Sequence, residues 1–288
     1  MGRIDIGLTG WGDHDTLYED LPSKASKLEA YARHFPAVEL DSSFYAVPPA
    51  KNIQKWLGET PEGFQFIPKA YQGMTGHQRG RSPFDSREEM LEAFRLAFTP
   101  MLEAGKLSYV LCQFPPWFDC TQKHVQYIKW LREELRRFPA ALEFRHSSWY
   151  TEAYKEKTLD YMKQDDWIHS VCDEPQIGER SIPWVGEATH KEHTLVRLHG
   201  RNKAAWQKPA SGQKWREVRY LYDYNEEELH DILEKVEKLT NQSRAVTVVF
   251  NNNSGGHAAG NAKRLQEMAG LPVKGPAPKQ LGLFDNED

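Results

Sequence analysis

The chain of 288 residues carries a formal net charge of −4, and 39% of its residues are hydrophobic and 12% aromatic. This length allows one large barrel domain or two ordinary domains, with enough apolar residues for a sizeable core. Such a mild charge does not by itself indicate a nucleic acid or a membrane as partner, and no apolar stretch approaches the roughly 18 residues of a membrane span.

The first residues and the cysteines indicate the cellular compartment. Residues 1–5 (MGRID) are too polar for a signal peptide. The three cysteines, Cys112, Cys120 and Cys172, are widely spaced and form no CxxC pair, so we expect neither a disulfide framework nor a zinc knuckle. We therefore expect a cytoplasmic protein with reduced thiols.

Short apolar runs alternate with helical spacings along the chain. In order, we predict a strand at 3–8, a helix at 23–34 with Ser23 as N-cap, a strand at 37–41, a helix from Pro48-Pro49 to about 58, a strand at 64–68, a helix at 86–98, a strand at 107–113, a helix at 122–136, a strand at 140–144, a helix at 152–164, strands at 167–172 and 194–199, a helix at 225–239 with Asn225 as N-cap, a strand at 245–250 and a helix at about 257–268. The segments 173–193 and 200–224 show little helical pattern.

Eight strands, most of them followed by a helix, indicate a parallel sheet with crossover connections. In about 270 residues this pattern predicts an α/β fold, a TIM-type (β/α)8-like barrel in which an irregular loop replaces one strand-helix unit. The structural rival is a doubly wound open sheet, but Thr9-Gly10-Trp11-Gly12 lacks the glycine spacing of a phosphate loop. We assign residues 1–269 to the barrel domain and residues 270–288, rich in Pro and Gly, to an exposed, disordered C-terminal tail.

Six of the predicted strands end on a polar group. In a closed parallel barrel the carboxyl ends of all strands meet at one mouth, so these groups converge on a single pocket. We therefore expect Glu39, Glu143 and His199 to be catalytic. The substrate-binding residues that this pattern predicts are Lys69, Gln113, Arg145, Arg197, Asn251 and Asn252, with Trp11 from the first turn.

A carboxylate inside an apolar strand is costly unless it is paired, protonated or bound to a cation. Glu39 and Glu143 could act as acid and base or hold a hard divalent ion. The alternative is that they form ion pairs with Arg145, Arg197 or Lys69.

Arg197 and His199 stand two residues apart in a strand, so their side chains share one face. Arginine suits bidentate recognition of phosphate or carboxylate, and His199 can act as proton shuttle or metal ligand. We expect no cofactor. Because the sequence has no HExxH motif and no histidine cluster, a divalent metal would depend on residues that the fold brings together, namely Glu39, Asp41, Glu143, Asp173 and His199.

Two loops at the predicted mouth are basic, at 69–81 and 201–224, and the second is interleaved with aromatic residues. This composition is typical of single-strand nucleic-acid grooves, and also of ordinary solvated loops. Aromatic residues that follow strand ends either provide stacking walls or cover the core. They are Trp11, Phe44, Tyr45, Trp117 and Trp149.

Several blocks of the sequence resemble one family, the domain of unknown function 72 (YecE-like) family. The blocks are Gly10-Trp11, residues 39–45 (ELDSSFY), 113–116 (QFPP), 141–149 (ALEFRHSSW), 197–200 (RLHG) and 250–253 (FNNN). The resemblance implies a TIM-barrel-type fold with a mouth rich in polar strand-end residues. It implies no particular reaction.

The tail contains a second resemblance. Residues 280–284 (QLGLF) are similar to the short peptide by which bacterial replication and repair proteins dock on the DNA sliding clamp. Leu283 and Phe284 would fill an apolar pocket, with Leu281 beside them, and Gln280 would form a hydrogen bond at its rim. The alternative is that the tail packs back on its own barrel.

We therefore expect an enzyme, a hydrolase, lyase or isomerase, that acts on an anionic phosphate- or sugar-containing substrate by acid/base chemistry and is recruited to DNA through the tail. The alternative is a non-catalytic adaptor that binds nucleic acid and the clamp.

Overall fold

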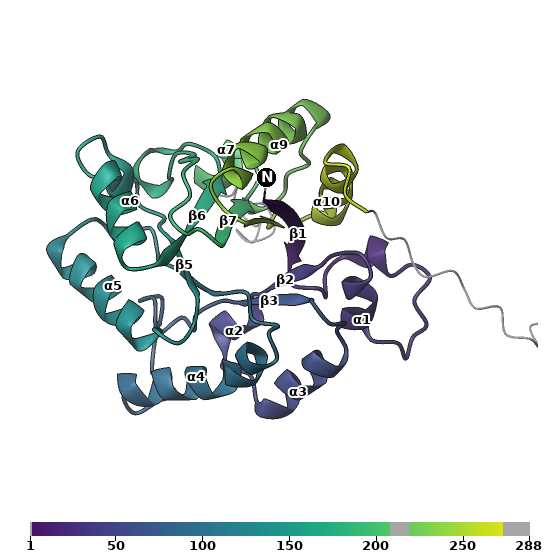
Figure 1. Cartoon of the computed structure of the whole chain (residues 1–288), viewed down its shortest axis with the longest axis horizontal. Helices are drawn as coiled ribbons and strands as arrows, with labels where there is room; N and C mark the ends of the chain where they lie inside the picture. Colours follow the sequence, from purple (N-terminus) through teal and green to yellow (C-terminus); the bar gives the residue numbers. More distant parts are fainter. Residues whose placement is uncertain (1, 208–218, 273–288) are drawn as a thin grey trace, which may run out of the picture.

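The computed structural model describes residues 2–207 and 219–272, and its parallel strands form one sheet in the order β3-β2-β1-β8-β7-β6-β5-β4 (Figure 1). The strands are β1 (Arg3–Thr9), β2 (Ala37–Leu40), β3 (Gln65–Pro68), β4 (Val110–Gln113), β5 (Ala140–Glu143), β6 (Trp167–Asp173), β7 (His193–Leu198) and β8 (Ala245–Phe250). All seven neighbouring pairs in this order are parallel.

The two edge strands of this sheet approach each other and nearly close it. Isolated parallel bridges join Phe66 to Leu107 and Lys69 to Leu111, and the Ala70 N–H donates to the Leu111 carbonyl at 2.9 Å. The predicted TIM-type barrel is therefore confirmed, and the doubly wound open sheet is wrong. Closure matters for function because it brings the carboxyl ends of all strands to one mouth.

Helices surround the sheet in Figure 1. They are η1 (Asp15–Leu17), α1 (Lys27–Ala32), α2 (Ser42–Tyr45), α3 (Ala50–Gly58), α4 (Arg87–Glu103), α5 (Gln122–Glu134), η2 (Ser147–Tyr150), α6 (Lys155–Gln164), η3 (Gly178–Arg180), α7 (Lys203–Gln207), α9 (Glu226–Thr240) and α10 (His257–Met268). Between β6 and β7 the described chain has only the short η3. An irregular segment therefore stands where the helix of one unit was expected, while all eight strands are present.

Two helix N-termini test the N-caps that the sequence predicted. Asn225 caps α9 as predicted, in a reciprocal capping box with Glu228. The predicted cap Ser23 is wrong, because α1 begins three residues later, where the Ser26 hydroxyl accepts from the Glu29 N–H. Glu29 also places an acidic side chain in the first turn of α1, where the helix dipole favours negative charge.

The barrel interior has an apolar floor. Its buried cluster, separate from the core between sheet and helices, consists of Ile67, Tyr109, Leu111, Ala141, Ile168, Leu195 and Val249. Since side chains on a strand repeat on one face every two residues, the next inward position toward the carboxyl end is polar on several strands. Leu195 is followed in this way by Arg197, and Ala141 by Glu143. The floor thus supports a polar layer directly above it.

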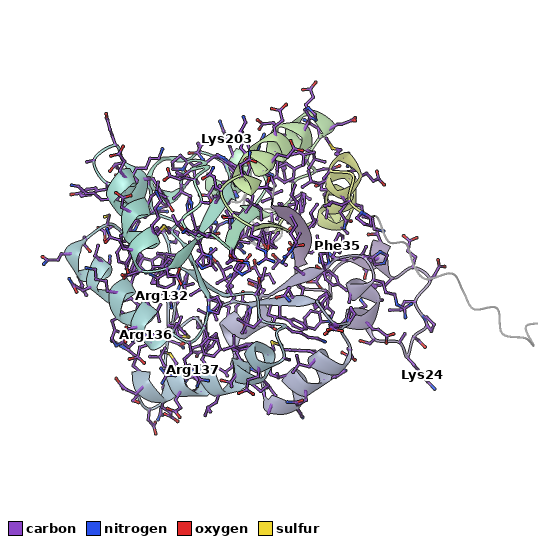
Figure 2. All side chains as sticks on the ribbon, in the orientation of Figure 1. Lys24, Phe35, Arg132, Arg136, Arg137 and Lys203 are labelled. Atoms are coloured by element: carbon purple, nitrogen blue, oxygen red, sulfur yellow. The ribbon has the colours of Figure 1, made fainter. Side chains whose placement is uncertain are left out.

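The outer surface is charged. Figure 2 shows labelled side chains such as Lys24, Arg136 and Lys203 projecting from the periphery, and all three are exposed. Phe35, also labelled, is buried against the core. In the ranges that the structure describes, no helix has both the length and the apolar character that crossing a bilayer requires. The predicted clamp-binding residues 280–284 lie outside the described residues.

Candidate functional site

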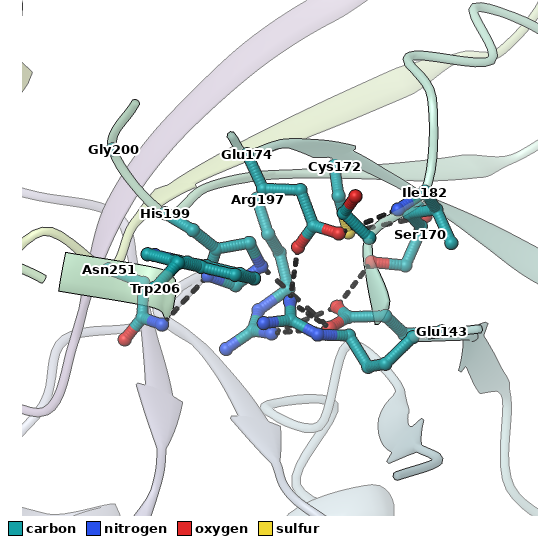
Figure 3. A network of polar contacts seen from close by, with 12 residues as sticks. Glu143, Ser170, Cys172, Glu174, Ile182, Arg197, His199, Gly200, Trp206 and Asn251 are labelled. Carbon is teal, nitrogen blue, oxygen red and sulfur yellow. Dashed lines mark hydrogen bonds and ion pairs between the residues drawn. The ribbon is translucent and has the colours of Figure 1, made fainter. Parts of the chain in front are cut away.

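Arg197 on β7 lies at the centre of a buried polar network (Figure 3). Its Nε and Nη2 donate to the two carboxylate oxygens of Glu39 at 2.8 and 2.6 Å. Its Nη1 donates to both oxygens of Glu143 at 3.0 and 2.9 Å. The structure thus brings together two glutamates that are 104 residues apart in sequence, from β2 and β5, through one guanidinium. The ion-pair alternative left open by the sequence is the arrangement found.

Glu143 is held from three sides. Besides Arg197, it accepts from Arg145 Nη1 at 3.2 Å and from the Ser170 hydroxyl at 3.0 Å. Arg145 in turn forms an ion pair with Glu174 at 2.9 Å, and the other Glu174 oxygen accepts from the Ile182 N–H at 2.8 Å. Acids and bases therefore alternate along a continuous chain across the mouth.

The three carboxyl groups of this chain differ in proton affinity. Burial raises the pKa of Glu39, although Arg197 and Lys69 oppose the rise. Burial acts in the same direction on Glu143, but two guanidiniums outweigh it and its net pKa lies below the ordinary value. Burial raises the pKa of Glu174 to about 7, against the opposing charge of Arg145. Environments that separate the pKa values of neighbouring carboxyls are the usual basis for acid and base roles.

His199 lies beside this chain with one ring nitrogen unused. The Asn251 side-chain Nδ2 lies 2.9 Å from His199 Nδ1. His199 Nε2 is buried and has no hydrogen-bond partner within residues 2–207 and 219–272, and the nearest Glu143 oxygen is 3.7 Å away. Burial, followed by the charges of Arg145 and Arg197, lowers the pKa of His199 well below its ordinary range. The imidazole is therefore neutral at pH 7.

Two acids that the sequence suggested as metal ligands are engaged in other ion pairs. Asp41 pairs with Lys69 at 3.0 Å. Asp173 accepts from Arg201 at distances of 2.8 to 3.1 Å and from the Tyr224 hydroxyl at 2.8 Å. Asp173 thus anchors the segment that follows β7 rather than facing Glu143.

The remaining predicted binding residues occupy different surroundings. Gln113 is half-buried at the end of β4 and lies in register with Glu143. Asn252 is buried and donates to the Tyr222 carbonyl and to Asn261, so it holds a loop. Trp11 packs edge-to-face against Trp56 on α3 at 5.4 Å.

Several members of the site were missed by sequence reasoning. Ser170 could have been found, since it follows the floor residue Ile168 by two positions on β6. Glu174 lies just beyond that strand and carried no local signal. Trp206 was part of a basic loop, yet its buried ring lies 5.0 Å from the Arg145 guanidinium and 4.0 Å from that of Arg219. Only the folded loop places it there.

One group of metal-type ligands exists within the network. Ligand atoms of Glu143, Cys172 and His199 lie within 4.8 Å of one another, and all three side chains are buried. Thiol, imidazole and carboxylate together suit Zn²⁺. A cation there would have to displace the guanidiniums from Glu143 and deprotonate Cys172, whose thiol pKa burial raises. Both requirements disfavour a metal ion at this group.

We predict that Arg197→Met destabilises the protein by about 3 to 5 kcal/mol, because two buried carboxylates lose their counter-charge. The free energy of unfolding in urea at pH 7 measures this. Arg3→Gln is the matched control. It removes an ion pair whose arginine is mostly exposed, and we expect a change below about 1 kcal/mol. An Arg197→Met protein as stable as the control would contradict the central role of this residue.

Glu174 makes stability depend on pH. In the unfolded chain its carboxyl ionises near the ordinary value of 4.5, whereas in the folded protein it keeps its proton up to about 7. Stability therefore falls as pH rises between these values. In Glu174→Gln we expect this loss to disappear, so that the variant gains on the order of 1 to 3 kcal/mol relative to the parent between pH 4.5 and 8.

The measurement is urea unfolding across that pH range, with the exposed Glu234→Gln on α9 as control. A stability difference between Glu174→Gln and the parent that stays constant with pH would refute the assignment.

Comparison with known proteins places this geometry in a family. Residues 5–281 match the family described as "Protein of unknown function DUF72". The chain is 57% identical over 281 residues to UPF0759 protein YunF of Bacillus subtilis (strain 168). The aligned region covers 98% of this chain and 100% of the relative. It is 26% identical over 157 residues, 54% of each protein, to UPF0759 protein YecE of Escherichia coli (strain K12).

Solved structures agree. A DUF72 family protein from Enterococcus faecalis V583 shares 37% identity with a TM-score of 0.89, covering 97% of this chain and 100% of that one. A DUF72 family protein from Thermotoga maritima MSB8 shares 29% identity with a TM-score of 0.76, covering 93% and 99%. The predicted family is thereby confirmed: this chain belongs to the DUF72 family.

Proposed function

We propose that the barrel mouth is the active centre of an enzyme that acts on an anionic phosphate- or sugar-containing substrate by acid/base chemistry. The reaction class would be hydrolysis, elimination or isomerisation. The observation that carries this proposal is His199 Nε2, a fully buried ring nitrogen that has no hydrogen-bond partner among the described residues and lies beside an ionised carboxylate. Buried polar atoms in folded proteins are nearly always paired, so an unpaired one at a barrel mouth marks a place for a ligand.

His199 is suited to donate a hydrogen bond. Because the Asn251 amide nitrogen donates to Nδ1, the proton of the neutral imidazole resides on Nε2. A neutral imidazole donates this hydrogen bond to a substrate oxygen and polarises it, while the proton stays on the ring. Since His199 is buried, a substrate reaches Nε2 only when neighbouring side chains shift, among them Tyr220, whose ring centroid lies 6.3 Å away.

The carboxyl groups divide the remaining roles. Glu143, with its lowered pKa, stays ionised and supplies a fixed negative charge beside His199. Glu39 and Glu174, with raised pKa values, are the groups that exchange protons. Burial raises the pKa of Glu174 to about 7, which meets the usual requirement for a general acid or base.

The cations of the mouth favour an anionic substrate. The guanidinium groups of Arg145 and Arg197 are part of the network. The Lys69 side chain lies at its edge and is 12% exposed. Guanidinium groups match phosphate and carboxylate geometry. Gln113 and Asn251 supply amides that orient such a group.

The test is turnover by purified protein on a panel of sugar phosphates and nucleotide esters. We expect His199→Gln to lower kcat by about 10²- to 10⁴-fold, with an unchanged unfolding midpoint. Glu174→Gln should remove the ionisation near pH 7 from the pH–rate profile. His230→Gln, at an exposed position on α9, is the matched histidine control. Activity that survives both network variants would exclude this site, and loss restored only by Zn²⁺ would replace acid/base chemistry with the metal alternative.

For the tail we propose, from its sequence, that residues 280–284 dock on the DNA sliding clamp. We expect a chain that lacks these five residues, or carries Leu283→Ala with Phe284→Ala, to lose retention on immobilised clamp, while Gln280→Ala weakens it. Lys279→Ala is the adjacent control that should leave retention unchanged. Equal retention of the parent and the truncated chain would refute the docking peptide. Clamp binding without any turnover would favour the adaptor.

A further inference from the structure

Four aromatic rings form a continuous row at one side of the mouth. Phe44 and Tyr45 follow β2, His77 follows β3 and Trp117 follows β4. Phe44 touches Tyr45 and His77 edge-to-face, with ring centroids 5.1 and 5.0 Å apart, and His77 touches Trp117 at 5.8 Å. We call these four residues the aromatic rim. Three successive strand-helix loops build it, so it is part of the mouth and not of a single loop.

The aromatic rim exposes large apolar surface. Trp117 is 56% exposed and Tyr45 is 44% exposed. Of the other large hydrophobic residues that are exposed in the described chain, Leu96 lies on α4 and Tyr154 directly before α6, while Leu221 lies in the segment that follows β7. An isolated exposed side chain needs no explanation, whereas neighbouring exposed rings at a barrel mouth indicate a binding surface.

Positive charge accompanies the rim. The Lys69 ammonium lies 4.7 Å from the centre of the Phe44 ring, and the Arg79 guanidinium lies 6.0 Å from that of Trp117. Arg79 and Arg81 are exposed, and the segment 69–81 contains no acidic residue. The rim therefore offers stacking faces beside cations with no carboxylate of its own segment to repel a polyanion.

The second basic loop does not offer such a surface in its described part. Trp206 is buried between two guanidiniums, and Arg201 pairs with Asp173. Tyr224 is also buried and bonded to Asp173. The aromatic and basic residues described there pack internally, and the exposed rings Tyr45 and Trp117 lie on the loops of the aromatic rim instead.

The rim is connected to the candidate active centre. His77 is at once a member of the rim and close enough to the network for Arg145 and Glu143 to act on its charge. Burial, with Lys69 and Arg145, lowers the pKa of His77 to about 4, so it presents a neutral ring at pH 7. A chain held on the rim would thus have one end directed toward the buried network.

We infer that the aromatic rim binds single-stranded nucleic acid, with bases stacked on Trp117 and Tyr45 and backbone phosphates on Arg79 and Arg81. Bases stack on aromatic side chains without regard to sequence, and cations along the path neutralise phosphates. A carbohydrate would also stack, but it would gain nothing from the two arginines unless it were charged. This inference rests on the proposed function and names the substrate class of the same mouth.

The experiment is fluorescence anisotropy of fluorescein-labelled (dT)8 with the full chain at about 50 mM salt. We expect Trp117→Ala to weaken binding by about tenfold or more, the size of one lost stacking contact. Arg79→Gln should reduce the slope of log K against log salt by about 0.7, the value for one phosphate contact on a single strand. Tyr154→Ala removes another exposed ring that lies 5.7 Å from a lysine ammonium, but on the outer layer, and should leave binding unchanged.

Three outcomes would overturn the inference. They are the absence of saturable binding, an equal effect of Trp117→Ala and Tyr154→Ala, and equally tight binding of a (dT)8·(dA)8 duplex or of heparin, in which no unstacked base is available. Binding is separable from turnover, because His199→Gln should bind (dT)8 like the parent. If the rim binds (dT)8 but none of the sugar phosphates and nucleotide esters is turned over, this inference stands and the proposed chemistry is refuted.

Discussion

The site depends on one guanidinium that holds two carboxylates across the barrel. Arg197 joins Glu39 on β2 to Glu143 on β5, and each of the three side chains is buried. Without Arg197 the two carboxylates would face one another in a medium of low dielectric, where an unpaired charge is very costly. The charged side chains above the apolar floor therefore depend on one another, because each one compensates the charge of its buried neighbours.

Burial and the neighbouring charges give the three carboxyl groups of this network different pKa values. Three carboxyl groups, on Glu39, Glu143 and Glu174, share the guanidiniums of Arg145 and Arg197. One carboxyl is in excess, so a proton is the simplest further counter-charge. That proton resides most readily on Glu174, which receives one guanidinium and one backbone N–H, whereas Glu143 receives two guanidiniums and a hydroxyl. Burial raises the pKa of Glu174 to about 7, and these two partners do not offset it, so this group changes protonation near pH 7.

The mouth is layered in a way that suits a large anionic ligand. An apolar floor closes the barrel below, the alternating ion-pair chain lies above it, and exposed rings with cations border the opening. Each layer changes the cost of charge. The floor excludes water, the network holds fixed charges, and the rim is exposed enough to capture a ligand. The proposed capture by Trp117 and the proposed chemistry at His199 therefore depend on different layers of the mouth.

The sequence by itself determined the barrel and the membership of its mouth in large part. Strand periodicity places Glu143 two residues beyond Ala141 and Arg197 two beyond Leu195, and parallel strands must end at one edge. Only the tertiary structure decided which charges pair, since β2 and β7 meet through a side chain across the barrel and not through neighbouring backbones. For the same reason the sequence did not predict Glu174 and Trp206 as members of the site. Asp173, which was expected as a possible metal ligand, instead forms an ion pair and a hydrogen bond that hold a loop. Their positions follow from how loops fold over the mouth, and local spacing carries no information about contacts at that distance.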